Sequence, residues 1–125
     1  MSREDLRSRG FWERAAAPAW YAAILVVVLG SLWPKPPDVL PGQSDKLVHL
    51  MMYLVLAFIP ARWFYPAKRV KQAVVFVLIL GAALEVGQYW SPGRFFDWAD
   101  LAANVAGTVI GLALGLTVFR RVRIA

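Results

Sequence analysis

Four long apolar runs, separated by short polar segments, dominate the chain. They cover about residues 15–33, 45–65, 70–90 and 97–119. A transmembrane helix needs about 20 predominantly apolar residues to cross the hydrocarbon core of a bilayer, and each run is close to that length. The pattern therefore predicts an all-α integral membrane bundle of four transmembrane helices.

The segments outside the runs are too short for a second domain. We expect a polar N-terminal tail at 1–14, one membrane domain at 15–119 and a basic C-terminal tail at 120–125. A cleaved signal peptide is the competing interpretation of the first run. No small-x-small cleavage pattern follows that run, which leads instead into Trp33-Pro34-Lys35-Pro36-Pro37, so we favour an uncleaved helix.

Proline and glycine mark the connections between the runs. The proline-rich segment 34–44 cannot be helical throughout, and Ser44 or Asp45 is a suitable N-cap for the second helix. At Ser91-Pro92-Gly93, proline fixes one φ and glycine accepts a positive φ. These residues predict a tight turn between the third and fourth helices.

Composition favours a membrane protein over a nucleic-acid-binding one. Hydrophobic residues make up 59% of the chain, and the formal net charge is +6. The basic residues flank the apolar runs, where membrane topology and anionic lipid head groups explain them better than nucleic acid does. The absence of cysteine excludes disulfides, thiol nucleophiles and cysteine-ligated metals.

The distribution of lysine and arginine predicts the orientation. Four helices place both tails and the middle connection on one side of the membrane, and eleven of the fourteen basic residues fall there. Cytoplasmic segments carry such an excess, so we expect both termini in the cytoplasm. The eleven are Arg3, Arg7, Arg9, Arg14, Arg62, Lys68, Arg69, Lys71, Arg120, Arg121 and Arg123, and the other three are Lys35, Lys46 and Arg94.

The remaining polar residues gather at the helix ends opposite the tails. They are Asp45, Lys46, His49, Glu85, Gln88, Arg94, Asp97, Asp100 and Asn104. Glu85 is the most informative of them, because its neighbours are apolar and a charge facing lipid would cost at least ~2.5–3.5 kcal/mol. We therefore expect it to face the bundle, with His49 or Arg94 as its partner, whereas Asp97 best fits a helix cap.

Helical geometry brings these residues to one level. Residues three or four apart share a helix face, and at 1.5 Å per residue His49, Glu85 and Asn104 each lie about 6–7 Å below the outer end of their helix. The sets are Asp45, His49 and Tyr53, then Glu85 and Gln88, then Asp100 and Asn104. We expect them to form one polar pocket.

Small residues repeat every four positions along the fourth helix. Ala103, Gly107, Gly111 and Gly115 form a ridge on the side that also carries Asn104. Such a ridge permits close helix contact. It predicts packing against the bundle rather than ligand binding.

Taken in order, these motifs resemble the VanZ-like family of bacterial membrane proteins. The pattern is Asp45-Lys46-x-x-His49-x-x-x-Tyr53, Glu85-x-x-Gln88, Pro92-Gly93-Arg94 and Asp100-x-x-x-Asn104-x-x-Gly107-x-x-x-Gly111, over about residues 40–115. The resemblance implies the bacterial cytoplasmic membrane and a role in the cell envelope. The family's founding member is linked to resistance to the glycopeptide antibiotic teicoplanin, and a resistance role and a housekeeping role both stay open here.

The first functional hypothesis is binding of an envelope lipid head group or a lipid-linked cell-wall precursor. Lys46 and Arg94 would contact phosphate or carboxylate. The expected partners are membrane lipids, anionic ones included, and self-association into homo-oligomers stays open. The proposed ligand-binding set is Asp45, Lys46, Tyr53, Gln88, Arg94, Asp100 and Asn104.

The alternative is a hydrolase or transferase acting on a lipid-linked envelope substrate. Glu85 and His49 would be its catalytic base and acid. A metal variant would use His49, Asp45, Glu85 and Asp100, an oxygen-rich set that suits Mg²⁺ or Mn²⁺ better than zinc. No familiar catalytic motif is present, so catalysis and cofactor stay open.

Two further interpretations concern the cluster as a whole. Its hydrogen bonds and ion pairs could serve only to fix helix register. A proton or ion pathway is disfavoured, because the halves of the helices away from the cluster carry no ionisable groups at membrane depth.

Overall fold

The computed structural model describes residues 2–33, 44–64, 66–93 and 95–117, and all the regular structure there is helical. The helices are α1 (Arg3–Leu32), α2 (Ser44–Trp63), α3 (Ala67–Gly87) and α4 (Trp98–Thr117), and the 3-10 turn η1 (Gln88–Trp90) continues α3. Four helices are long and apolar enough to cross a membrane. The prediction of an all-α bundle with four transmembrane helices is confirmed.

α1 begins earlier than the hydrophobic pattern predicted. It starts at Arg3, whereas the apolar run begins near residue 15, and its candidate membrane span is Gly10–Leu32. Hydropathy reports the part of a helix that suits apolar surroundings, while arginine and glutamate continue a helix at little cost. The extension contacts the bundle through Trp12, whose ring stacks on Trp63 of α2 with centroids 6.3 Å apart.

The other helix ends lie close to their predicted positions. The turn predicted between the third and fourth helices is present, and Gly93 takes the positive φ of 75° that it requires. The segment 34–43 and the C-terminal tail from residue 118 lie outside the described residues.

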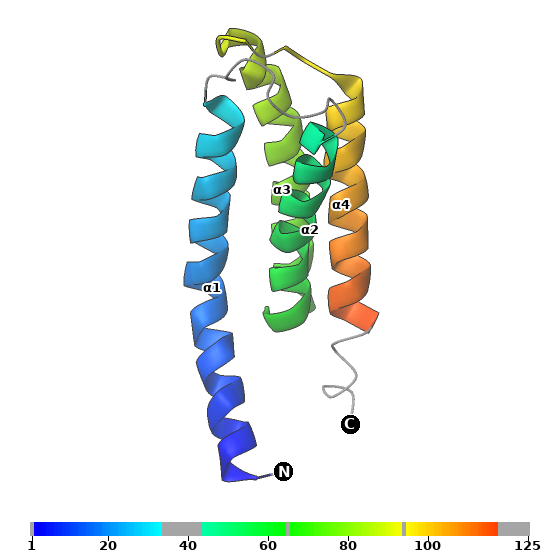
Figure 1. Cartoon of the computed structure of the whole chain (residues 1–125). Coiled ribbons are helices and arrows are strands. Elements are labelled where there is room, and N and C mark those ends of the chain that lie inside the picture. Colours follow the sequence, from blue (N-terminus) through cyan, green and yellow to red (C-terminus); the bar gives the residue numbers. More distant parts are fainter. Residues whose placement is uncertain (1, 34–43, 65, 94, 118–125) are drawn as a thin grey trace.

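α2 and α4 lie side by side and run in the same direction, antiparallel to α1 and α3 (Figure 1). We call the end at which α2 and α4 begin the polar end, because it carries Lys46, Glu85 and Asp97. The opposite end, with Arg62 and Arg69, is called the basic end. α1 extends beyond the other helices at the basic end (Figure 1).

The glycine ridge of α4 lies against the backbone of α2. A Cβ atom added at Gly107 or Gly111 would overlap the carbonyl oxygen of Leu50 or Leu54, respectively. At Gly115, an added Cβ would lie 2.5 Å from the Cβ of Ala61. Small residues allow two membrane helices this close approach, and it fixes the level at which the polar ends of α2 and α4 meet.

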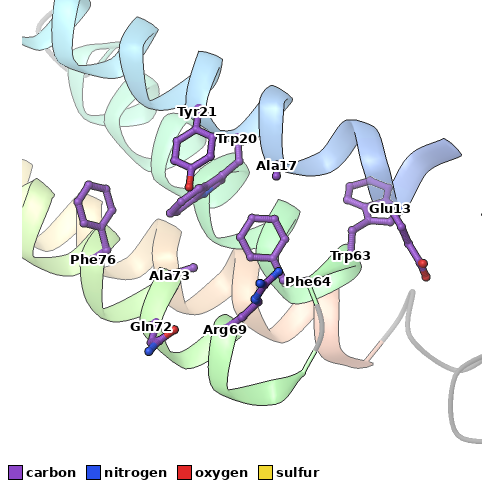
Figure 2. Close-up of a pocket in the computed structure, with 10 residues that line it drawn as sticks. All are labelled: Glu13, Ala17, Trp20, Tyr21, Trp63, Phe64, Arg69, Gln72, Ala73 and Phe76. Atoms are coloured by element: carbon purple, nitrogen blue, oxygen red, sulfur yellow. The ribbon is translucent and has the colours of Figure 1, made fainter. Parts of the chain in front are cut away.

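Trp20 is the main anchor of α1. Its indole N–H donates a hydrogen bond of 2.8 Å to the carbonyl oxygen of Leu56 in α2, and only 6% of the residue is exposed. Its ring also makes edge contacts with Phe64 and Phe76, which brings α3 into the same cluster (Figure 2). The indole therefore satisfies its polar atom while its apolar body packs between helices.

Candidate functional site

A layer of buried polar side chains lies near the polar end. The side chains come from α2, α3 with η1, and α4, and each residue is at most 6% exposed. We call this group the polar layer. Its members are His49, Tyr53, Glu85, Gln88, Asp100 and Asn104.

His49 and Asn104 form a direct link between α2 and α4. The Nδ1 atom of His49 lies 2.9 Å from Oδ1 of Asn104. An amide oxygen can only accept a hydrogen bond, so Nδ1 of His49 is the donor in this contact, and the contact orients the imidazole ring. His49 is one of the two partners expected for Glu85, and it pairs with Asn104 instead.

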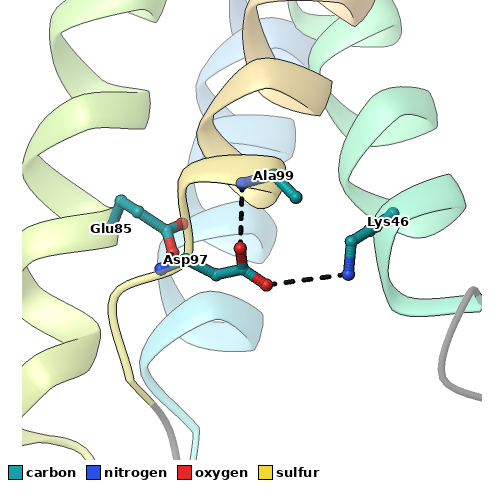
Figure 3. A network of polar contacts seen from close by, with 4 residues as sticks. All are labelled: Lys46, Glu85, Asp97 and Ala99. Carbon is teal, nitrogen blue, oxygen red and sulfur yellow. Dashed lines mark hydrogen bonds and ion pairs between the residues drawn. The ribbon is translucent and has the colours of Figure 1, made fainter.

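Glu85 of α3 holds the start of α4. Its Oε1 atom accepts a hydrogen bond of 2.9 Å from the backbone N–H of Asp97 (Figure 3). The first N–H groups of a helix have no partner within the helix, so a carboxylate at this place is favourable. Glu85 is 1% exposed and therefore faces the bundle, and its hydrogen-bond partner among the described residues is a backbone group. Arg94, the other partner expected from the sequence, lies outside the described residues.

Asp97 joins this arrangement to α2. Its Oδ1 accepts a hydrogen bond of 2.8 Å from the backbone N–H of Ala99, which is the capping geometry that its position predicted. Its Oδ2 lies 3.6 Å from Nζ of Lys46 (Figure 3). The side chains of Lys46 and Asp97 are 35% and 41% exposed, so this ion pair forms the rim of the otherwise buried layer.

Tyr53 lies one helical turn below His49, at a point where three helices meet. A Cβ added at Gly81 of α3 would lie 3.0 Å from Cε1 of Tyr53 and 3.5 Å from Nδ2 of Asn104. The glycine at position 81 therefore makes the room that the tyrosine ring and the amide occupy.

Gln88 is buried with the layer but points elsewhere. Its Nε2 donates a hydrogen bond of 3.0 Å to the carbonyl oxygen of Ser31 in α1. Next to it, Ser91 Oγ donates to the carbonyl oxygen of Leu32 at 2.8 Å. These two bonds attach the end of α1 to the connection after α3, so Gln88 stabilises the fold rather than reaching His49.

Two predicted site residues cannot be placed within the polar layer. Arg94 lies outside the described residues, and Asp45 lies in α2 with a side chain that is not among those described. Among the described side chains, no three from His, Cys, Asp and Glu lie close enough together to hold a metal ion. The weak metal set that includes Asp45 stays a prediction.

The sequence pattern indicates Asp97 only as a helix cap and does not point to Gly81 or Ser31. The capping position of Asp97 gives no sign of its contacts to Lys46 and Glu85, which belong to other helices. A glycine within an apolar run and a backbone carbonyl at the end of a helix carry no local signal for such contacts. A carboxylate directly before one helix and a lysine at the start of another form a pattern that could have pointed to the contact between Lys46 and Asp97.

The arrangement provides three chemical capabilities. Lys46 offers a partly exposed cation at the rim, the Glu85 and Asp97 carboxylates accept hydrogen bonds, and His49 is an oriented imidazole below them. A histidine oriented by an amide oxygen resembles the His-Asn part of the Cys-His-Asn arrangement in papain-like proteases. Recognition of a polar head group and acid–base chemistry both remain compatible with these groups.

Comparison with known protein families agrees with the motif pattern. The family model described as VanZ/LLP1 matches residues 9–120. Searches of curated proteins and of solved structures gave no significant match. The matched segment includes the described polar layer and all of the candidate spans. Four candidate spans among the described residues make the protein a multi-pass membrane protein. Because the family model matches most of the length of the chain, the chain belongs to the VanZ/LLP1 family.

Proposed function

We propose that the protein binds the polar head group of an envelope lipid or a lipid-linked cell-wall precursor at its polar end. The observation that carries this proposal is the convergence of α2, α3 and α4 on one polar layer with a charged rim. Lys46 and Asp97 form that rim, and His49, Glu85 and Asn104 lie beneath it. If the ligand is a cell-wall precursor, binding would also provide a link to glycopeptide resistance.

A polar layer of this size is an expensive way to hold helices together. Ionisable residues within a membrane are costly, and their presence points by default to function. Apolar side chains of similar volume often replace buried ion pairs without loss of stability. The glycine ridge already joins α2 to α4, so packing alone gives little reason for His49 and Asn104 at the same contact.

The rim suits a ligand that carries phosphate and hydroxyl or amino groups. The ion pair between Lys46 and Asp97 is partly exposed and 3.6 Å long, and such pairs contribute only ~0–1 kcal/mol. A phosphate can therefore compete with Asp97 for the ammonium group. The Asp97 carboxylate then accepts hydrogen bonds from hydroxyl or amino groups of the same ligand.

Lys46→Ala is expected to weaken head-group binding about fivefold, because one basic group near a membrane surface contributes ~1 kcal/mol to the attraction of an anionic lipid. Native mass spectrometry of the purified protein measures this with two probes, short-chain phosphatidylglycerol and farnesyl pyrophosphate. Lys71→Ala is the matched control, because it removes the same charge from the basic end. Equal affinity of both variants for both probes would contradict the proposal.

Enzymatic action on the bound molecule is the second candidate, and the His49–Asn104 pair favours it. The pair fixes the ring so that Nε2 can take or give a proton. Glu85 lies in the same layer and is the second acid–base group. The mass of the recovered ligand distinguishes the two candidates, since binding leaves the mass unchanged and hydrolysis or transfer alters it.

We also propose that the polar end faces the extracytoplasmic side and the basic end the cytoplasm, following the excess of basic residues. The chain has no cysteine, so single cysteines report topology without background. In spheroplasts, Ser91→Cys is expected to react with a membrane-impermeant maleimide, while Ala67→Cys reacts only after permeabilisation. Labelling of Ala67→Cys alone in sealed spheroplasts would reverse the assignment.

A further inference from the structure

A second feature lies far from the polar layer. A pocket of about 540 Å³ opens near the basic end, where α1 and α3 line its two sides and the end of α2 contributes Trp63 and Phe64 (Figure 2). No residue of the polar layer lines it. The lining residues that matter here are Glu13, Ala17, Trp20, Tyr21, Arg69, Gln72 and Phe76.

The pocket changes character with depth. Arg69 and Gln72 lie near the start of α3, at the basic end. Phe76 lies seven residues beyond Arg69 along the helix, which places it about 10 Å further from the basic end. Trp20 and Tyr21 of α1 lie opposite Phe76 (Figure 2). The charged and amide side chains of the pocket therefore lie toward the basic end, whereas its deeper part is lined by aromatic rings.

Charge and surroundings together indicate the occupant. The pocket lies between helices that are candidate membrane spans, so lipid is the medium that enters it. Arg69 belongs to an exposed basic cluster with Lys68 and Lys71, which attracts phosphate. Arginine also presents several N–H donors in a planar fork that matches phosphate oxygens.

We propose that this pocket binds a glycerophospholipid from the leaflet at the basic end. The phosphodiester contacts Arg69, and one acyl chain lies between α1 and α3 against Trp20, Tyr21 and Phe76. Glu13 stands at the same opening (Figure 2), where it can accept a hydrogen bond from a head-group hydroxyl or ammonium group. This inference does not rest on the function proposed for the polar end.

The test uses delipidated full-length protein titrated with phosphatidylglycerol or phosphatidylethanolamine and measured by native mass spectrometry. Arg69→Ala is expected to weaken lipid binding about tenfold or more, because it removes a direct charge-assisted hydrogen bond to the phosphodiester. Ala17→Phe is expected to weaken it further by filling the acyl region. If Arg69→Ala weakens binding of both lipids, the phosphodiester that they share is the group recognised. If it weakens binding of phosphatidylglycerol alone, the site also requires a net negative charge on the lipid.

Matched controls separate a site from general attraction. Lys71→Ala removes the same charge from α3, but Lys71 does not line the pocket, so this variant should lose only general attraction and bind the lipid no more than about fivefold more weakly than the wild type. Equal losses in Arg69→Ala and Lys71→Ala would overturn the proposal, as would unchanged binding in a folded Ala17→Phe variant. Lys46→Ala should leave the Arg69-dependent binding intact, which keeps this result distinct from that of the polar end.

Discussion

Replacing Gly111 by leucine is expected to prevent α2 and α4 from packing as they do in the structure. Even a single Cβ atom at this position would overlap the carbonyl oxygen of Leu54. That oxygen belongs to a helix backbone and cannot rotate away, so the two helices must separate. Overpacking typically costs ~1–3 kcal/mol, and we expect Gly111→Leu to reach at least the upper end of that range.

The loss is measured as the thermal midpoint of the purified protein in one detergent, with folded yield as a second readout. Gly30→Leu is the control, because a Cβ at Gly30 of α1 meets no heavy atom within 4 Å beyond its own helix backbone and chain neighbours. The control should keep a midpoint close to the wild type. Similar losses in both variants would mean that added volume, rather than the contact between α2 and α4, causes the effect.

Glu85→Ala is expected to produce the second large loss. It removes the acceptor of the Asp97 N–H and leaves that group unsatisfied at the start of α4. An unsatisfied buried donor costs ~1–3 kcal/mol, and because this hydrogen bond is only partly buried its loss should cost toward the lower end of that range. The cavity left by the buried Glu85 side chain adds to this. Val86→Ala is the matched control for thermal stability, since Val86 is the next residue and is 50% exposed. A midpoint for Glu85→Ala no lower than that of Val86→Ala would contradict the role assigned to the carboxylate.

Glu85→Gln separates the two candidate functions at this residue. The amide oxygen of glutamine can still accept the Asp97 N–H, so stability should fall much less than in Glu85→Ala. If the protein only binds a head group, Lys46-dependent binding survives the change. If it is an enzyme with Glu85 as its base, turnover is lost while binding remains, because an amide does not take up a proton at neutral pH.

The polar layer and the pocket at the basic end would give the two ends of the bundle different ligands. The polar end presents the Lys46 cation above the oriented His49, whereas the pocket at the basic end presents Arg69 above aromatic side chains. α1 is the element that both regions share, since Gln88 fixes one end of it and Trp20 anchors its middle. A lipid in the pocket at the basic end would therefore contact α1, the helix that also borders the polar end.

The sequence by itself determined the number of helices, the turn before α4 and the end of the bundle that is polar. These properties depend on local quantities, namely the apolar length of each run, the freedom of Gly93 to take a φ of 75° and the spacing of polar residues along one helix. It also drew attention to six polar residues that are buried in the structure, namely His49, Tyr53, Glu85, Gln88, Asp100 and Asn104. Helix periodicity is enough to say which side chains share a face and a depth.

Only the tertiary structure decided which of these groups touch. The sequence favoured His49 or Arg94 as the partner of Glu85. Among the described residues, Glu85 accepts a hydrogen bond from the backbone N–H of Asp97 and His49 pairs with Asn104, while Arg94 lies outside them. The order of helices around a bundle depends on contacts between distant residues, and here the close approach along the α4 glycines makes α2 and α4 parallel neighbours. That pairing places His49 beside Asn104 and Lys46 beside Asp97. The periodicity of a single helix cannot predict these contacts, because they join two different helices.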